Sequence, residues 1–191
     1  NLVFIGDGYT QSELDNKYLN DVNTNVNYLF KSGGLTEPFP SYANYFNIYA
    51  VSIASSESGA DEPTKNVYKS TALDASFAWG FPDQIVDSSL FFNTKLADYA
   101  VSTAFTGTGI IPDIKVGLVN TDRSGGTGEF GGWGVSPGTK PDIMAHEMGH
   151  SFILLADEYS HIGGSPGFFG EPIEVNVTWD KTGAKWSHWM G

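Results

Sequence analysis

The sequence contains no cysteine among its 191 residues. Disulfide bonds and thiolate metal sites are therefore excluded, and a bound metal would have to be held by histidine, aspartate or glutamate side chains. Basic residues are also scarce, with 10 Lys and Arg against 22 Asp and Glu and a net charge of -12. This balance argues against nucleic acid as a partner and against an anionic membrane surface, because both attract clustered Lys and Arg.

Long apolar stretches are missing as well. No run of about 18 apolar residues occurs, so we expect no membrane insertion by this chain. The chain begins with Asn1 rather than methionine, shows no signal peptide and stops abruptly after Gly191, so we expect that sequence is missing at both ends. With 40% hydrophobic and 14% aromatic residues, residues 1–191 should form a single domain with a sizeable core.

Strand-like and helix-like patterns alternate along the chain and predict an α/β (α+β) fold. The apolar residues 2–5 predict a buried strand, and apolar residues spaced by three and four predict an amphipathic helix over residues 10–34. A second buried strand is predicted over residues 45–55, parallel to the first through a right-handed crossover. Residues 55–82 are predicted to be a long surface segment. The later predicted elements are a short strand at 88–94, a helix at 95–105, a strand at 115–122 and a helix that begins near Pro141.

The last of these helices carries the strongest chemical signal, the sequence HEMGH at residues 146–150. His146 and His150 lie one helical turn apart and point the same way, so both imidazoles can reach one ion. Glu147 lies at the edge of that face, where it can act on a water molecule at the metal without being a ligand itself. The alternative is two capped or surface histidines, which the rarity of this pattern in a chain with 4 histidines disfavours.

Zinc normally takes a third protein ligand, and none of the six residues after His150 binds metal. The next candidates are Asp157 and Glu158. Seven residues of straight helix rise about 10.5 Å, which is too far for a carboxylate at the far end to share an ion with His150. If Asp157 is the ligand, the helix must therefore end between Ile153 and Ala156, and the chain must fold back. Glu158 would need a larger rearrangement, so we favour Asp157 as the ligand. Glu158 would then either support a ligand or form an ion pair at the end of the helix.

Weaker candidates have ordinary structural explanations. His161 follows the motif in a loop and His188 lies between two tryptophans, and both are more typical of structural or solvent-facing histidines than of ligands. Asp7 lies between two glycines and could bind a cation, but a tight strand-to-helix turn is the better explanation. The acidic residues within 55–63 have the density of a calcium site without the spacing of a calcium loop, so Ca2+ is an unsupported second cofactor.

These motifs together resemble a known family. HEMGH followed by LADEY, with LVFIGDGYT near the start and SGGTGEFGG before the helix, is similar to the family 64 metallopeptidases, which are immunoglobulin A peptidase-like zinc endopeptidases often grouped near the metzincins. The resemblance covers most of the chain. It implies a metzincin- or zincin-like catalytic domain with a mixed twisted sheet, a backing helix and an active-site helix that carries HExxH. It also implies His146, His150 and Asp157 as ligands of one catalytic Zn2+, with Glu147 as the catalytic base.

Two positions depart from the family pattern. Family members turn the chain at a glycine after the second histidine, whereas this sequence has Leu154 near that point. A left-handed turn at a residue other than glycine costs about 1 kcal/mol. Metzincin-like enzymes also carry a methionine turn beneath the metal. Met190 is the only methionine after the motif, and because it lies at the very end of the chain we do not assign it that role.

The predicted function is that of a zinc-dependent endopeptidase, in which metal-activated water hydrolyses a peptide bond with Glu147 as general base. The glycine-rich residues 124–134 are either an edge strand that pairs with an extended protein or peptide substrate or an ordinary hairpin. Phe130 and Trp133 would then be core residues or the walls of a subsite. The substrate-binding residues of the first alternative are Gly128, Glu129, Phe130, Gly131 and Gly132.

Two other functions remain open at this level. The chain could be a non-catalytic, zinc-stabilised binding or adhesion module on a bacterial surface, although a structural site has no need of a base at Glu147. It could also be a zinc hydrolase of a non-peptide amide or ester, which the glycine-rich segment disfavours. The family resemblance implies an extracellular location, at the bacterial cell surface, in the periplasm or secreted.

Overall fold

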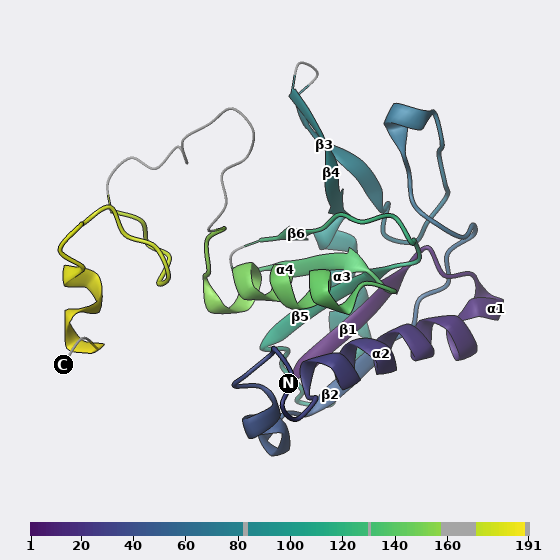
Figure 1. The fold of residues 1–191 in the computed structure, drawn as a ribbon. Helices are drawn as coiled ribbons and strands as arrows, with labels where there is room; N and C mark the ends of the chain where they lie inside the picture. Colours follow the sequence, from purple (N-terminus) through teal and green to yellow (C-terminus); the bar gives the residue numbers. More distant parts are fainter. Residues whose placement is uncertain (82–83, 130, 158–170, 190–191) are drawn as a thin grey trace.

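The structure is a computed structural model that describes residues 1–81, 84–129, 131–157 and 171–189. Its centre is a five-stranded mixed sheet with helices on both faces, and a two-stranded antiparallel sheet lies beside it (Figure 1). The small sheet pairs β3 (Ser76–Phe81) with β4 (Gln84–Phe91). The strands of the large sheet, in spatial order, are β2 (Ile48–Val51), β1 (Leu2–Asp7), β5 (Ile114–Val119), β7 (Trp133–Pro137) and β6 (Thr127–Gly128).

Most pairings in the large sheet are parallel. β1 pairs in parallel with β2 and with β5, and β5 pairs in parallel with β7, whereas β6 is antiparallel to β7. The parallel pair of β1 and β2 confirms the strand–helix–strand unit predicted from the sequence. The prediction that the second strand is buried is wrong, because β2 is an edge strand and only Val51 within it is buried.

The helices follow the predicted order. The first predicted helix consists of α1 and α2 with a π-helical turn between them, and the Glu13 carboxylate accepts a hydrogen bond of 2.8 Å from the Thr10 backbone N–H at its start. No helix among the described residues has the length and apolar character needed to cross a membrane. The helical elements are α1 (Gln11–Glu13), η1 (Leu14–Tyr18), α2 (Leu19–Leu29), α3 (Thr94–Ala104) and α4 (Pro141–Ile153), with 3-10 helices η2 (Pro40–Tyr45), η3 (Pro63–Lys65) and η4 (Ala184–Trp189).

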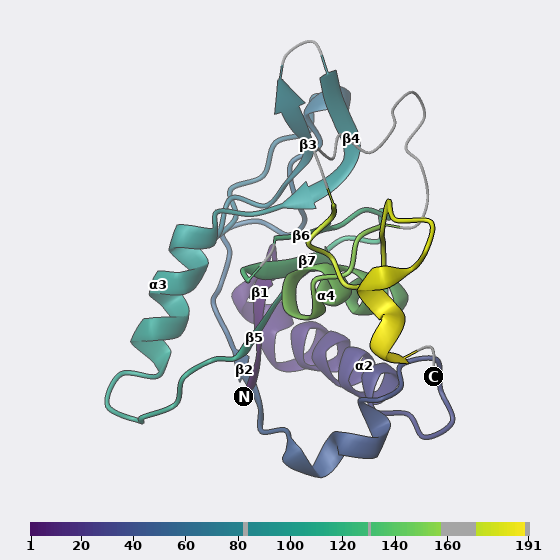
Figure 2. The same cartoon turned by 90° about the vertical axis from the view of Figure 1, so that its left-hand side faces the viewer.

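Side chains of β1 alternate between two cores on opposite faces of the sheet. Leu2 and Phe4 pack on the face covered by α2 and α4, whereas Val3 and Ile5 pack on the face covered by α3 and the small sheet (Figure 2). The alternation follows from the two-residue repeat of a strand. Burial of both faces is what parallel strands require, and it explains why the residues of β1 are apolar without interruption.

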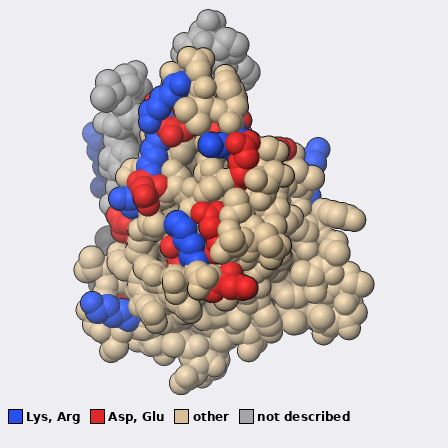
Figure 3. All heavy atoms as spheres, turned by 90° about the vertical axis from the view of Figure 1, so that its right-hand side faces the viewer, with Lys and Arg blue, Asp and Glu red and all other residues tan. Residues whose placement is uncertain are grey.

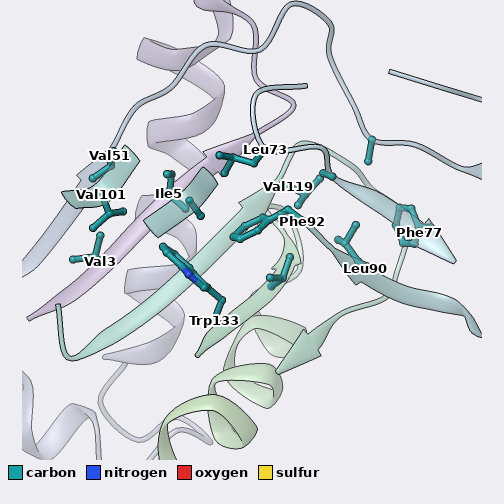
Figure 4. Packing of buried hydrophobic residues seen from close by; sticks show 14 residues of the cluster. Val3, Ile5, Val51, Leu73, Phe77, Leu90, Phe92, Val101, Val119 and Trp133 are labelled. Atoms are coloured by element: carbon teal, nitrogen blue, oxygen red, sulfur yellow. The ribbon is translucent and has the colours of Figure 1, made fainter. Parts of the chain in front are cut away.

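Trp133 lies at the centre of the second core (Figure 4). Its side chain is 1% exposed, and its ring meets that of Phe92 edge to face at 5.5 Å between centroids. Its indole N–H donates a hydrogen bond of 3.0 Å to Asp98 on α3. Trp133 is therefore a core residue rather than a subsite wall.

Residues 55–82 were expected to be a surface segment, and the structure corrects this. The segment contributes to the second core and contains β3, and its buried residues include Ala60, Leu73, Ala75 and Phe77. The cause is the buried carboxylate of Asp7, at the end of β1. It accepts hydrogen bonds from the backbone N–H groups of Leu73 and Ala75, each at 2.9 Å, and from the hydroxyls of Ser55 and Thr71. These bonds hold the segment against the sheet, which periodicity alone does not show.

Charged side chains on one face are interleaved rather than sorted by sign. Figure 3 shows acidic and basic groups side by side over the upper part of that face, and few charged groups over its lower part. Among the ion pairs of the molecule, Arg123 binds both Glu62 and Asp87 at 2.7 Å, and its guanidinium lies over the ring of Phe77. These contacts tie the small sheet to the loop that follows β5.

Candidate metal centre

Helix α4 presents two faces of different character. It begins at Pro141, as predicted, because the fixed φ of proline suits the first helical position. Met144 and Met148 are each 1% exposed and pack against β1, β5 and α2, an arrangement that stabilises the fold by about 2 kcal/mol per side chain. His146 and His150 each lie two residues after one of these methionines, about 200° around the helix, so they point away from that core.

The helix ends at Ile153, within the interval predicted from the sequence. Leu154 then adopts the left-handed conformation with φ 62° and ψ 44°, so the chain turns at a leucine rather than at a glycine. The backbone N–H of Leu155 donates a hydrogen bond of 3.0 Å back to the carbonyl of Gly149. The chain thereby reverses over the last helical turn and carries Asp157 back toward the histidines.

Three potential ligand atoms meet at this reversal. The Nε2 atoms of His146 and His150 lie 3.1 Å apart, and Oδ1 of Asp157 lies 3.2 Å from the first and 3.3 Å from the second. An ion about 2.0 to 2.1 Å from each of its ligands in tetrahedral geometry would separate those ligands by about 3.3 Å. The three atoms therefore have the spacing that a tetrahedral zinc ion needs, with a fourth position left over, and the nitrogen and oxygen donors suit zinc.

The ring of His150 is held in the orientation that metal binding requires. Its Nδ1 lies 2.5 Å from the backbone carbonyl oxygen of Leu155, which accepts a hydrogen bond from that nitrogen. With the proton on Nδ1, the lone pair of Nε2 is free to face Asp157 and His146. The reversal after Ile153 thus delivers an orienting carbonyl as well as a carboxylate.

Glu147 lies beside this triangle, in a more buried place. Its side chain is 8% exposed, and one of its oxygens lies within 4.8 Å of ring nitrogens of His146 and His150. Burial raises the pKa of the Glu147 carboxyl to about 7, His150 acts in the opposite direction, and the charge of Asp157 raises it further. A carboxyl with a pKa near neutrality is suited to accept and return a proton.

The glycines before β7 allow close packing of β6 on α4. A side chain at Gly126 would place its Cβ 2.5 Å from Oε1 of Glu147, and one at Gly128 would meet the Glu147 carbonyl oxygen and Cβ of His150. The backbone N–H of Gly131 also donates a hydrogen bond of 3.0 Å to the carbonyl of Ser151. The approach of the helix thus explains Gly126 and Gly128, and the sequence did not reveal this approach.

The predicted substrate segment contains an edge strand that is also one half of a hairpin. β6 is an edge strand of the large sheet, and it pairs with β7 as a hairpin. Glu129 is exposed, and the carbonyl of Glu129 accepts a hydrogen bond of 2.7 Å from the Gly132 N–H at the turn. Gly128 lies in β6 and Gly131 follows at the turn, whereas Phe130 lies outside the described residues.

A pocket of about 320 Å3 lies over the triangle. Its lining residues are Ala145, His146, Gly149, His150, Leu155, Ala156, Asp157 and Asn176. Asn176 was not identified from the sequence, because nothing in its neighbouring residues marks it as a hydrogen-bond partner of Ala156. Glu147 is not among the lining residues, and its carboxyl lies against Gly126, immediately before β6.

The remaining candidates include residues that the structure does not describe. Glu158, His161 and Met190 fall outside the described residues, and His188 is an exposed residue of η4. Asp7 is occupied by hydrogen bonds from protein donors, which agrees with the structural explanation of that residue. Among the described residues, His146, Glu147 and His150 form a group whose potential ligand atoms lie within 4.8 Å of one another, and no residue of the acidic stretch 55–63 belongs to it.

Two comparisons with known proteins bear on this site. A family model described as IgA Peptidase M64 matches residues 1–191, the whole length of the sequence. No curated protein matches the chain. The family match therefore covers the helix, the reversal after it and the segment that contains Asn176.

Proposed function

The chain belongs to the IgA peptidase M64 family, and on that premise we propose that it is a zinc-dependent endopeptidase with His146, His150 and Asp157 as zinc ligands. Family membership makes it a peptidase, whose substrate is a protein or peptide. The observation that carries the finer proposal is the position of Asp157, whose Oδ1 lies 3.2 Å and 3.3 Å from the two histidine nitrogens. A ligand triangle of this spacing fits zinc.

Zinc in this site would supply Lewis acidity, lowering the pKa of a water molecule and polarising the scissile carbonyl. Glu147 is the general base in this proposal. Its carboxylate accepts a proton from the attacking water and then gives it to the departing amine. In the metal-free chain burial raises the pKa of Glu147 to about 7, and a carboxyl whose pKa is raised toward neutrality is suited to exchange a proton.

The substrate would lie along β6, in an extended conformation. β6 is at the end of the sheet and packs against α4, so its outer edge is adjacent to the metal-binding helix. An extended peptide added to this edge gains main-chain hydrogen bonds without a sequence requirement. We assign Gly128, Glu129, Gly131 and Gly132 to this surface, together with Phe130. Specificity for a particular protein depends on loops and attached domains rather than on the fold.

We propose further that residues 1–191 form a single zincin-like catalytic domain, with HExxH on α4, a backing helix α2 and a mixed sheet. We also propose an extracellular location, secreted or at the bacterial cell surface or periplasm, in keeping with the family resemblance. One catalytic Zn2+ satisfies the observed donor set. The same donors would suit a zinc-stabilised adhesion module, and activity measurements separate the two.

The decisive experiment compares Glu147→Gln with wild type. We expect the variant to bind one zinc per chain, as wild type does, while kcat for a denatured protein substrate falls by about 100- to 10,000-fold. Glu37→Gln is the control, because Glu37 is exposed and the same charge is removed. Full activity in Glu147→Gln would refute the assignment of the base, and a wild-type protein with zinc but without cleavage of any peptide bond would favour the adhesion module.

A further inference from the structure

Residues 171–189 hold the chain reversal that carries Asp157. Residues 171–189 lie beyond the C-terminal end of α4 (Figures 1 and 2). The Asn176 side chain binds the backbone of Ala156 twice: its Nδ2 donates to the Ala156 carbonyl at 2.8 Å, and its Oδ1 accepts from the Ala156 N–H at 2.9 Å. Both polar groups of the residue immediately before Asp157 are therefore fixed by one side chain.

The loop that presents Asn176 is itself braced. The Lys185 ammonium donates to the backbone carbonyls of Pro172, Glu174 and Val177, at 2.5, 2.6 and 2.8 Å. The Trp186 indole N–H donates a further bond of 2.8 Å to the Val175 carbonyl. Asn176 lies within this braced loop, so its amide approaches Ala156 from a chain segment with its own hydrogen-bonded support.

The reversal needs such support for two reasons. Leu154 is held in the left-handed region, which costs about 1 to 2 kcal/mol for a residue with a side chain. The chain has also left the helix, so the N–H and carbonyl of Ala156 have no partners along the helix ladder. A primary amide supplies a donor and an acceptor in one plane, and an asparagine can satisfy both groups at once.

We propose that Asn176 is a positioning residue for the third metal ligand. It holds Ala156 so that the Asp157 carboxylate faces His146 and His150, and it thereby couples docking of residues 171–189 to metal affinity. This inference rests on the proposed metal site. The coupling is reciprocal, because a contact that raises metal affinity is itself strengthened when metal binds.

The first test is zinc affinity of the full chain, measured by competition with a chromogenic chelator. Asn176→Leu keeps the shape of the side chain and removes both hydrogen bonds, and we expect it to weaken zinc binding by about 10- to 100-fold. Asn176→Asp keeps the acceptor for the Ala156 N–H but sets an oxygen against the Ala156 carbonyl oxygen, so it should also weaken zinc binding. Asn44→Asp, on the exposed surface of η2, is the control for the added charge.

The second test separates positioning from general stabilisation. In an Asp157→Asn background, Asn176→Leu should cause no further loss of zinc affinity, because Asn176 acts through the ligand that has been replaced. The visible absorption spectrum of the cobalt-substituted protein should also change in Asn176→Leu. An anchoring role alone would lower the unfolding temperature of the metal-free chain but leave the cobalt spectrum and the zinc dissociation constant unchanged.

Hydrogen exchange gives a readout of the coupling that does not depend on activity. We expect zinc to increase protection of residues 171–189 in wild type and not in Asn176→Leu. Equal zinc affinity in wild type, Asn176→Leu and Asn176→Asp would overturn the inference while the proposed function stands. A wild-type chain that binds no zinc would overturn both. If Asn176→Leu does not fold, the Asp variant decides through its zinc dissociation constant.

Discussion

The Oδ1 atom of Asp157 lies 3.2 Å from the Nε2 atom of His146, although helix α4 ends between the two residues. A continuous helix would have separated them along its axis by about 1.5 Å per residue. The contact therefore exists only because Leu154 turns the chain through a left-handed conformation. The candidate metal site is formed by the end of the helix as much as by the helix itself.

The third ligand can be identified by charge removal. Loss of a residue that supports a ligand weakens metal binding by about 10- to 100-fold. Asp157→Asn should weaken zinc binding by more than this, because it removes a charged ligand. Glu158→Gln, one position further on, should leave the zinc dissociation constant close to that of wild type. Competition with a chelator measures both, and a larger effect at Glu158 would transfer the ligand role to that residue.

The left-handed residue should accept glycine and reject a β-branched side chain. Leu154→Gly relieves about 1 kcal/mol of backbone strain. Glycine also raises the conformational entropy of the unfolded chain, which offsets a similar amount of free energy. We therefore expect little net change in the free energy of unfolding. Leu154→Val places a β-branched side chain at a positive φ, which should open the reversal and lower both the unfolding temperature and zinc affinity. Equal zinc affinity in the valine variant would contradict the geometry of the turn.

Burial of Glu147 should make the stability of the metal-free chain depend on pH. Its pKa is raised to about 7 in the folded state, above the value of about 4.3 in an unfolded chain, so the folded state holds the extra proton between these values. The contribution of Glu147 to stability should thus be greatest below about pH 4.3, fall as the pH rises to about 7, and stay constant above that pH. The total fall is on the order of 3 kcal/mol.

Chemical denaturation across that pH range, with zinc removed by a chelator, measures this effect. The difference in unfolding free energy between wild type and Glu147→Gln should follow the predicted slope, because the glutamine does not titrate. A difference that is independent of pH between 4.3 and 7 would show that burial does not hold Glu147 protonated in the metal-free protein.

Asp7 is predicted to be essential for stability and not for catalysis. Asp7→Asn replaces an acceptor of several protein hydrogen bonds with a group that presents donors to the Leu73 and Ala75 N–H groups. We expect a loss of about 3 kcal/mol or more in the free energy of unfolding. Asp74→Asn is the control, because Asp74 is exposed and has a left-handed conformation that asparagine tolerates. Similar stability of the two variants would contradict the structural role.

Local patterns were sufficient for much of the fold. The uninterrupted apolar residues of β1 and the helical spacing of α2 both depend on periodicity within one element, and the structure contains both. The same patterns failed at residues 55–82. There the buried positions of Leu73 and Ala75 depend on hydrogen bonds to Asp7, far away in the sequence. The position of β2 at the edge of the sheet could not be predicted either, because it depends on which strands pair with β2 in the folded structure.

The sequence by itself determined the chemistry available at the site. With no cysteine, any metal ligands had to be histidine, aspartate or glutamate side chains, and the rise of a helix required the helix to end before Asp157 could reach His146 and His150. Only the tertiary structure decided what holds that break in place. The bonds from Asn176 to Ala156 and from His150 to the Leu155 carbonyl join atoms brought together by folding, and no local pattern encodes such contacts.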